Sequence, residues 1–140
     1  MDIKIVESNA ELEQAYHVRT TVFVEEQKVP PEMELDQFDE TAIHLVGTKN
    51  GVPIAAARLR FVDTYGKLER ICVLDTERGK SYGKLMIQRM ELEIKNNDYN
   101  KAKLNAQTHA EAFYERLGYE TVSGEFMDAG IPHVTMVKEL

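Results

Sequence analysis

The spacing of hydrophobic and polar residues changes period several times along the chain, and each period predicts a different element. Residues 3–6 have the composition of a short strand. Ser8 and Glu11 then have the spacing of a capping box, which marks the start of a helix. We expect this helix to run from residue 9 into the region 20–25, where β-branched residues weaken the helical preference.

A proline pair separates this helix from a group of strands. Pro30 and Pro31 break any continuation of the helix, and residues 32–40 form an acidic loop with room for one short helical turn. Three strands then follow across short turns, the first of which contains the hairpin dipeptide Asn50-Gly51. Because turns this short join antiparallel strands, we expect a meander. Its predicted strands are residues 42–48, 52–62 and 67–74.

The second half of the chain alternates helices with strands. Residues 81–95 have an amphipathic pattern, with their large apolar residues mostly on one side of a helix. A later helix ends at Gly118, the usual left-handed stop. The other predicted elements are a strand at residues 102–106, that later helix at 110–117, and a final pair of strands at 119–122 and 133–137. This order predicts an α+β fold with a mixed sheet, in a single domain spanning residues 1–140.

Composition narrows the class of protein. A chain of 140 residues suits one domain. No apolar stretch approaches the roughly 20 residues that a membrane-spanning helix needs, and the N-terminal residues lack the pattern of a signal peptide. Because Cys72 is the single cysteine, no intrachain disulfide is possible. We therefore expect a cytoplasmic protein without a membrane partner.

The charge balance bears on possible partners. Lys and Arg number 17 against 24 Asp and Glu, which gives a formal net charge of −7. This balance disfavours nucleic-acid binding, which depends on a cationic surface. It is compatible with a cationic substrate such as an amine, although many acidic proteins use this charge only to stay soluble.

The segment between the third meander strand and the next helix carries the clearest chemical signal. Small residues at Gly79, Ser81 and Gly83 let several main-chain N–H groups turn toward one point. The helix that follows adds its free N–H groups and the positive end of its dipole. Together they predict a receptor for a diphosphate, made of Arg78, Gly79, Lys80, Ser81, Tyr82, Gly83 and Lys84.

Two kinds of phosphate-binding loop compete for this segment. A nucleoside-triphosphatase loop needs G-x-x-x-x-G-K-[ST], and Gly79-Lys80-Ser81 supplies only its end. Leu74 stands where the first glycine of that motif belongs. The segment more closely resembles the coenzyme A loop of the GNAT acetyltransferases, Q/R-x-x-G-x-G/A, as Arg78-x-x-Ser81-x-Gly83. It departs from that motif at Ser81, a residue type that prefers negative φ.

Two further stretches strengthen the resemblance. The GNAT phrase N-x-x-A-x-x-F-Y-x-x-x-G-F/Y is matched by Gln107-x-x-Ala110-x-x-Phe113-Tyr114-x-x-x-Gly118-Tyr119. The first third is similar to the ElaA branch of the superfamily, especially its YjcF-type bacterial members. The residues concerned are 18–27, Val29-Pro30, Glu34-Leu35-Asp36, Asp39 and 42–45, together with Ala106-Gln107 at the end of the fifth strand.

This resemblance covers nearly the whole chain and implies both a fold and a reaction. The fold would be a mixed, mostly antiparallel sheet flanked by helices and splayed between its fourth and fifth strands to admit the cofactor. The reaction would transfer an acetyl group from acetyl-CoA to a primary amine, by direct attack in a ternary complex. Acetyl-CoA would serve as co-substrate, with no metal. The acceptor would be a small molecule or a peptide, and the protein a monomer or a homodimer.

The resemblance also places the groups that such a reaction needs. Ile71, Cys72 and Val73 would run beside the pantetheine arm of coenzyme A, and the Val73 N–H would donate to the developing oxyanion. Tyr114 would be the general acid for the leaving thiolate. The alternative for Tyr114 is a packing role beside Phe113.

The general base stays open between several residues. Glu69 is one option, the alternative being a solvated carboxylate or an ion pair with Arg70. His44 titrates in a suitable range, although a lone strand histidine is more often a satisfied, partly buried residue. Water can also relay the proton. Glu34, Asp36 and Asp39 either form a rim for a cationic substrate or lie in a solvated acidic loop.

Other chemistries receive less support. Cys72 could carry an acyl group, but a small buried hydrophobe is the more ordinary role of a free cysteine. The four histidines are scattered, without the ligand spacing of a metal site. A non-catalytic module that binds coenzyme A or another protein is the main alternative to an enzyme.

Overall fold

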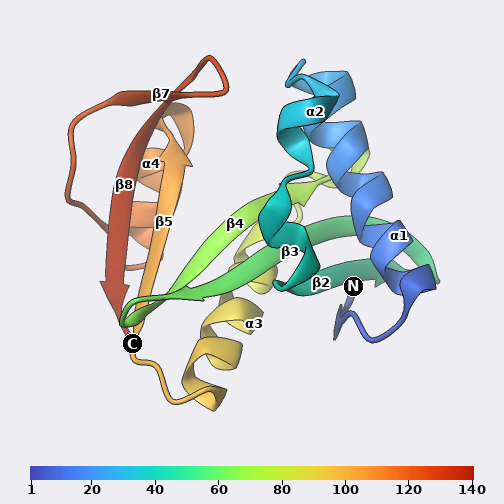
Figure 1. Ribbon diagram of the computed structural model, residues 1–140, viewed down its shortest axis with the longest axis horizontal. Coiled ribbons are helices and arrows are strands. Elements are labelled where there is room, and N and C mark those ends of the chain that lie inside the picture. Colours follow the sequence, from blue (N-terminus) through green and yellow to red (C-terminus); the bar gives the residue numbers. More distant parts are fainter.

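The computed structural model describes residues 1–140, whose strands form one mixed sheet (Figure 1). The strand order is β1-β2-β3-β4-β5-β8-β6, and β7 pairs with β8. Only the β4–β5 pair is parallel. The strands are β1 (Asp2–Ile5), β2 (Ile43–Lys49), β3 (Val52–Val62), β4 (Tyr65–Val73), β5 (Lys101–Gln107), β6 (Glu120–Thr121), β7 (Phe126–Asp128) and β8 (Ile131–Glu139). The expected α+β class and the meander are confirmed.

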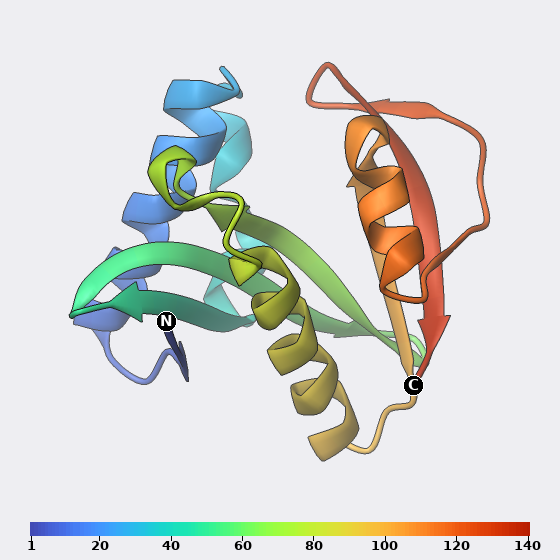
Figure 2. The same cartoon turned by 180° about the vertical axis from the view of Figure 1, so that it is seen from behind.

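Helices cover both faces of this sheet, as Figures 1 and 2 show from opposite sides. On one face α1 packs over β2 and β3, and on the other α3 packs over β3 and β4 and α4 lies beside β5. The helices are α1 (Asn9–Arg19), α2 (Pro31–Glu34), α3 (Tyr82–Asn96) and α4 (Glu111–Arg116). Shorter turns are the π-helical η1 (Thr20–Glu26) and the 3₁₀ segments η2 (Gln37–Glu40), η3 (Asp75–Glu77) and η4 (Thr108–Ala110). None of the helices is long and apolar enough to cross a membrane.

Apolar packing divides into two clusters, one on each side of the sheet. The larger lies beneath α3, where Met86, Ile87, Met90 and Ile94 are buried against strand residues. The smaller lies beneath α1 and includes Val18 and Cys72. Packing against the sheet therefore fixes the positions of α1 and α3.

Three predicted elements differ from the structure. The first helix reaches the β-branched region as expected, but it continues there as the π-helix η1 and not as an α-helix. Pro31 does not only break structure, since it begins α2 at a position where its missing N–H is tolerated. Finally, β7 lies inside the segment expected to be a loop, joined to β8 by a turn at Ala129-Gly130, both with positive φ.

The sheet opens between β4 and β5. Their parallel pairing covers only residues 66–68 of β4 and 102–104 of β5, after which the strands diverge (Figure 1). β5 then follows β8 along its whole length, while β4 stays with β3. The expected splay between the fourth and fifth strands is therefore present.

An extra residue in β4 lies at the point of divergence. Ala56 pairs with Cys72 but Arg58 pairs with Glu69, so β4 carries one residue more than β3 over this stretch. Arg70 takes a left-handed φ of 54° there, which is rare for a residue with a side chain. Such a bulge bends and twists its strand. It turns the second half of β4 away from β5.

Candidate active site

A cavity of about 1000 Å³ fills the gap between the diverging strands. Its walls come from η1, from β4, from the loop before α3, and from the end of β5 with α4. The cavity brings together most residues singled out in the sequence, namely Glu69, Ile71, Cys72, Val73, Arg78, Gly79, Ser81, Tyr82, Gly83, Lys84 and Tyr114. It does not include Lys80, whose ammonium is 2.7 Å from Glu77 Oε2, or His44.

The open edge of β4 presents main-chain groups to this cavity. The Leu74 N–H donates to the Ile54 carbonyl across the β3–β4 ladder at 2.9 Å. In an antiparallel ladder, main-chain groups of successive residues point to opposite sides. The main-chain groups of Val73 therefore face the gap, and by the same alternation those of Ile71 do too. Consistent with this direction, Arg78 Nε donates to the Val73 carbonyl at 3.1 Å.

The loop before α3 also turns main-chain groups toward the cavity. Gly79 has a φ of +79° and Ser81 a φ of +64°. The first N–H groups of α3, from Tyr82 to Lys84, have no partner inside the helix. A Cβ at Gly83 would meet nothing nearer than Phe113 Cζ at 3.7 Å, so the side of the helix facing the cavity is bare.

The conformation of Ser81 corrects an expectation. We expected a serine here to take negative φ, but the residue is left-handed as a glycine would be. Its side chain makes no capping hydrogen bond that would offset this strain. The backbone at Ser81 therefore has the left-handed conformation that a glycine adopts without penalty, and the serine side chain makes this conformation less favourable.

Replacing Ser81 with glycine should stabilise the protein by about 1 kcal/mol, because glycine takes a left-handed φ without steric penalty. The gain is measured as the free energy of unfolding in urea. Ser81→Ala is the control, since it removes the hydroxyl but keeps the Cβ, and should gain nothing. Equal stability of Ser81→Gly and Ser81→Ala would show that the turn is not strained.

Arg78 holds the loop to η1. Its guanidinium forms a bidentate pair with Glu26, at 2.6 and 2.7 Å. The hydrogen bond to Glu26 raises the pKa of Arg78 further and lowers that of Glu26. Because its charge is already paired, Arg78 orients the loop while main-chain N–H groups remain the free donors.

Tyr114 both packs against neighbouring rings and lines the cavity. Its ring packs edge-on against Phe113 and Tyr119, with centroids 5.1 and 5.9 Å apart. The side chain also lines the cavity, and its hydroxyl has no hydrogen-bond partner in the protein. Burial raises the pKa of Tyr114 to about 12, so the phenol stays protonated at neutral pH.

Glu69 lies in the cavity wall but is heavily paired. The structure corrects its expected partner, because Arg70 turns away to the carbonyls of Met33 and Glu34. Glu69 instead accepts from Arg58, Arg60 and Lys67. Despite its burial, these cations lower the pKa of Glu69 to about 2. A carboxylate of that pKa takes up protons poorly.

His44 is not brought to the site. It borders a separate hollow beside residues 6–9, and its Nε2 lies 2.8 Å from the Asp39 carbonyl oxygen. Burial lowers the pKa of His44, which keeps the ring neutral. The partly buried, structural role is therefore the one that the packing supports.

Three carboxylates of the acidic loop, Glu34, Asp36 and Asp39, are paired with arginines and do not line the cavity. Glu34 and Asp39 are buried, and both bind the fully buried Arg19, each at 2.7 Å. Asp36 binds Arg58 at 2.7 Å. Arg19 gave no sign of this role in the sequence, because its partners lie 15 and 20 residues away. These carboxylates serve to hold α1, α2 and β3 together.

Cys72 is buried, and its thiol donates to the Ala56 carbonyl at 3.7 Å. Burial raises the pKa of Cys72 to about 12, which keeps the thiol protonated and unreactive.

Sequence reasoning also missed a contact across the gap: Gln107 Nε2 donates to Gln27 Oε1 at 2.9 Å. No three His, Cys, Asp or Glu side chains gather as metal ligands.

Known proteins are similar to this chain in sequence and architecture. The domain family described as "Acetyltransferase (GNAT) domain" matches residues 6–140. The N-acetyltransferase YjcF of Bacillus subtilis is 41% identical over 140 residues, covering 99% of this chain and 100% of the relative. The crystal structure of Escherichia coli ElaA, 26% identical, has a TM-score of 0.89 and covers 99% of this chain and 100% of that one. A GNAT acetyltransferase from Elizabethkingia anophelis with acetyl-CoA bound, 14% identical, has a TM-score of 0.77 over 99% and 97% of the two chains.

Proposed function

Since this chain belongs to the GNAT acetyltransferase family, we propose that it moves the acetyl group of acetyl-CoA directly to a primary amine while both substrates are bound. The likeness to ElaA and YjcF inferred from sequence motifs is confirmed by these relatives. The cavity between β4 and β5, with free main-chain donors on one wall and an unpaired phenol on another, is the observation that carries the proposal.

The residues before α3 fit the diphosphate of coenzyme A. The left-handed Gly79 and Ser81 and the unpartnered N–H groups that open α3 supply several donors on one side. The bare Gly83 leaves room for phosphate oxygens to approach the backbone. The 15-residue α3 adds its dipole.

The edge of β4 fits the pantetheine arm and the thioester. The arm lies between the diphosphate and the acetyl group, so the amide farther from the loop should meet the carbonyl oxygen. We therefore propose the Ile71 N–H, which follows the bulge, as the oxyanion donor in place of the Val73 N–H expected from the sequence. Val73 would then pair with the arm. A fixed main-chain donor stabilises negative charge without reorganising during the reaction.

Tyr114 is proposed to donate its phenolic proton to the sulfur as the C–S bond breaks. The amine lone pair forms the new C–N bond, and the thiolate leaves with the electrons of the old bond. Burial raises the pKa of Tyr114, which makes it a weaker acid, but the same burial raises the proton affinity of a thiolate beside it and so offsets this effect.

Of the three candidates for taking the proton from the amine, Glu69, His44 and water, we favour water. Glu69 is too strongly paired to act as a base, and His44 lies outside the cavity. The cavity is open at its mouth, where half-exposed polar side chains such as Gln107 would hold water molecules.

Calorimetry followed by a thiol-release assay tests the proposal against its main alternative. Wild-type protein should bind acetyl-CoA and release free coenzyme A when amines are added. Binding without turnover of any amine, including the anionic probes described below, would identify a non-catalytic module instead. If acetyl-CoA did not bind, the protein would not be an enzyme or a binding module that uses coenzyme A.

Replacing Gly83 with valine should raise the dissociation constant for acetyl-CoA at least a hundredfold, because losing two charge-assisted hydrogen bonds to phosphate amounts to about 3 kcal/mol or more. The Cβ has room among protein atoms, so the fold should survive. Gln88→Val is the control, an exposed α3 position outside the cavity. Unchanged affinity in Gly83→Val would place the diphosphate elsewhere.

A further inference from the structure

The floor beside the cavity carries a row of positive side chains. Arg60 on β3 pairs in register with Lys67 on β4, and Lys67 pairs with Lys103 on β5. Residues in register on adjacent strands point to the same face of a sheet. We call Arg60, Lys67 and Lys103 the cationic row. Lys67 also lines the cavity, so the row is continuous with the proposed site.

The row lacks the carboxylates that would neutralise it. Glu69 is the one acid bonded to it, and Arg58 shares that acid. Three cations against one carboxylate leave two positive charges in excess, in a chain whose net charge is −7. Two residues before Lys103 on β5, Lys101 has an acid, Glu139, as its cross-strand neighbour. The excess is therefore a local feature and does not follow from composition.

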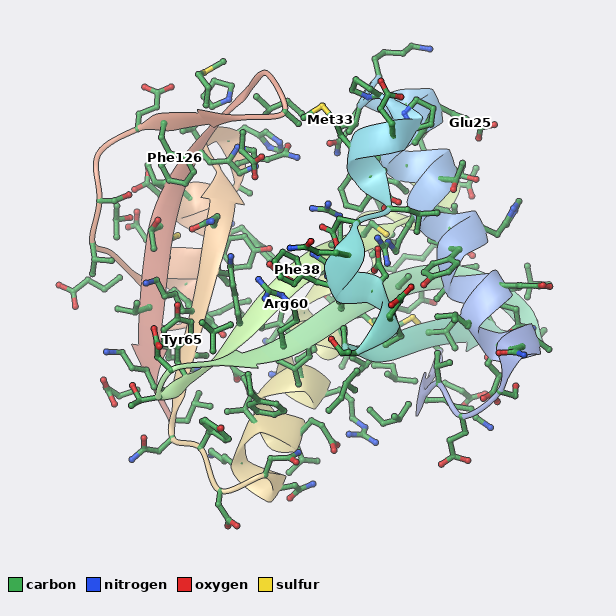
Figure 3. The ribbon with its side chains drawn as sticks, viewed as in Figure 1. Glu25, Met33, Phe38, Arg60, Tyr65 and Phe126 are labelled. Atoms are coloured by element: carbon green, nitrogen blue, oxygen red, sulfur yellow. The ribbon has the colours of Figure 1, made fainter.

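Two members of the row keep donors free. Arg60 uses Nε and Nη2 to bind Glu69, while its Nη1 makes no hydrogen bond. Its guanidinium lies flat against the Phe38 ring, 3.9 Å from the centroid, which fixes its direction. Lys103 has no acidic partner and rests 4.8 Å from the centroid of the Tyr65 ring. Figure 3 shows Phe38 and Arg60 close together in front of the sheet, and Tyr65 near the start of β4.

Like charges directly opposite one another on adjacent strands destabilise a sheet. Nothing in the packing of the core requires them here, because none of the three side chains belongs to either apolar cluster. An anion bound above the row would relieve the repulsion. The position of the row beside the acetyl-transfer cavity indicates that this anion belongs to the acceptor.

We propose that the acceptor is a primary amine that also carries an anionic group, held by Arg60, Lys67 and Lys103 while its amine reaches the thioester. The proposal rests on the proposed function, since it places the amine beside Ile71. Ile71 and Lys67 are four residues apart on one strand, which sets a separation of about 10–13 Å between amine and anion. It replaces the cationic acceptor that the acidic composition suggested.

Matched eight-carbon amines test this directly. The thiol-release assay compares 8-aminooctanoate and 8-aminooctyl phosphate with 8-aminooctanamide and 1,8-diaminooctane. We expect kcat/KM to be about tenfold or more higher for an anionic probe than for the amide, since one hydrogen-bonded ion pair contributes about 1.5 kcal/mol. Salt should reduce this preference, and the two anions distinguish a carboxylate from a phosphate acceptor.

Two variants connect the preference to the row. Lys67→Gln and Lys103→Gln should each reduce the ratio between anionic and amide probes. Lys95→Gln, the same change of charge at an exposed α3 position, should keep it. An equal or higher rate with the amide or the diamine would overturn the inference while leaving acetyl transfer intact, and so would a ratio unchanged in both row variants.

A binding measurement decides the matter if no probe is turned over. The reaction product 8-acetamidooctanoate and its amide are titrated into the protein with coenzyme A present. Tighter binding of the anion, lost in Lys103→Gln, supports the inference, and equal binding contradicts it. Failure of coenzyme A itself to bind would refute the proposed function and, with it, this inference.

Discussion

Replacing Tyr114 with phenylalanine lowers kcat by about a hundredfold or more and leaves the dissociation constant for acetyl-CoA nearly unchanged, the range expected for loss of a general acid. The ring stays in place against Phe113 and Tyr119, so only the hydroxyl facing the cavity is lost. Single-turnover experiments, which isolate the chemical step from product release, provide the measurement.

Tyr119→Phe is the matched control for this prediction. Tyr119 is the neighbouring tyrosine, but its hydroxyl donates to Glu91 at 2.8 Å and it does not line the cavity. Its variant should be slightly less stable and equally fast. A Tyr114→Phe enzyme with the single-turnover rate of the wild type would remove Tyr114 from the mechanism.

Replacing Arg19 with methionine destabilises the protein by about 3 kcal/mol, because two buried carboxylates lose the guanidinium that pairs them. Arg19 is fully buried, and it alone joins Glu34 to Asp39 beneath α1. Loss of this size lowers the melting temperature by about 10 °C in a domain of this length. Urea unfolding and calorimetry measure it, and Arg116→Met, at an exposed α4 position, is the control.

The stability of the protein at low pH provides a second test of the ion pairs between Arg19, Glu34 and Asp39. The pKa of Asp39 is lowered to about 2 from 3.8, chiefly by hydrogen bonds to Arg19 that outweigh its burial. A lowered folded pKa gives stability that is present above pH 3.8 and is lost as pH falls toward 2. This acid-dependent loss should be smaller in Arg19→Met. Identical stability of variant and wild type at neutral pH would contradict a structural role for the network.

The sequence predicted what depends on local pattern. The expected bounds of β3 agree with the observed ones, and the observed α3 begins and ends one residue later than expected. Ser8 caps α1 as expected, although the Glu11 carboxylate accepts from the Glu7 N–H and not from Ser8. Such signals act over a few residues, which is why spacing reveals them.

What the sequence could not give depends on contacts between distant residues. The ion pairs of Arg19 join residues that only the fold brings together, so neither a substrate rim nor a solvated loop describes Glu34 and Asp39. The bulge at Arg70 and the left-handed Ser81 are imposed by the surrounding structure against local preference. The cationic row needs the register of three strands before it becomes visible.

The proposed chemistry depends on one placement, that of a diphosphate against the N–H groups that open α3. A crystal structure of the protein with acetyl-CoA tests it most directly. We predict diphosphate oxygens within hydrogen-bond distance of the main-chain nitrogens between Gly79 and Lys84, with the sulfur near the Tyr114 hydroxyl. Phosphates bound anywhere else, with that turn free of the ligand, would contradict the proposed diphosphate site and the acetyl transfer that depends on it.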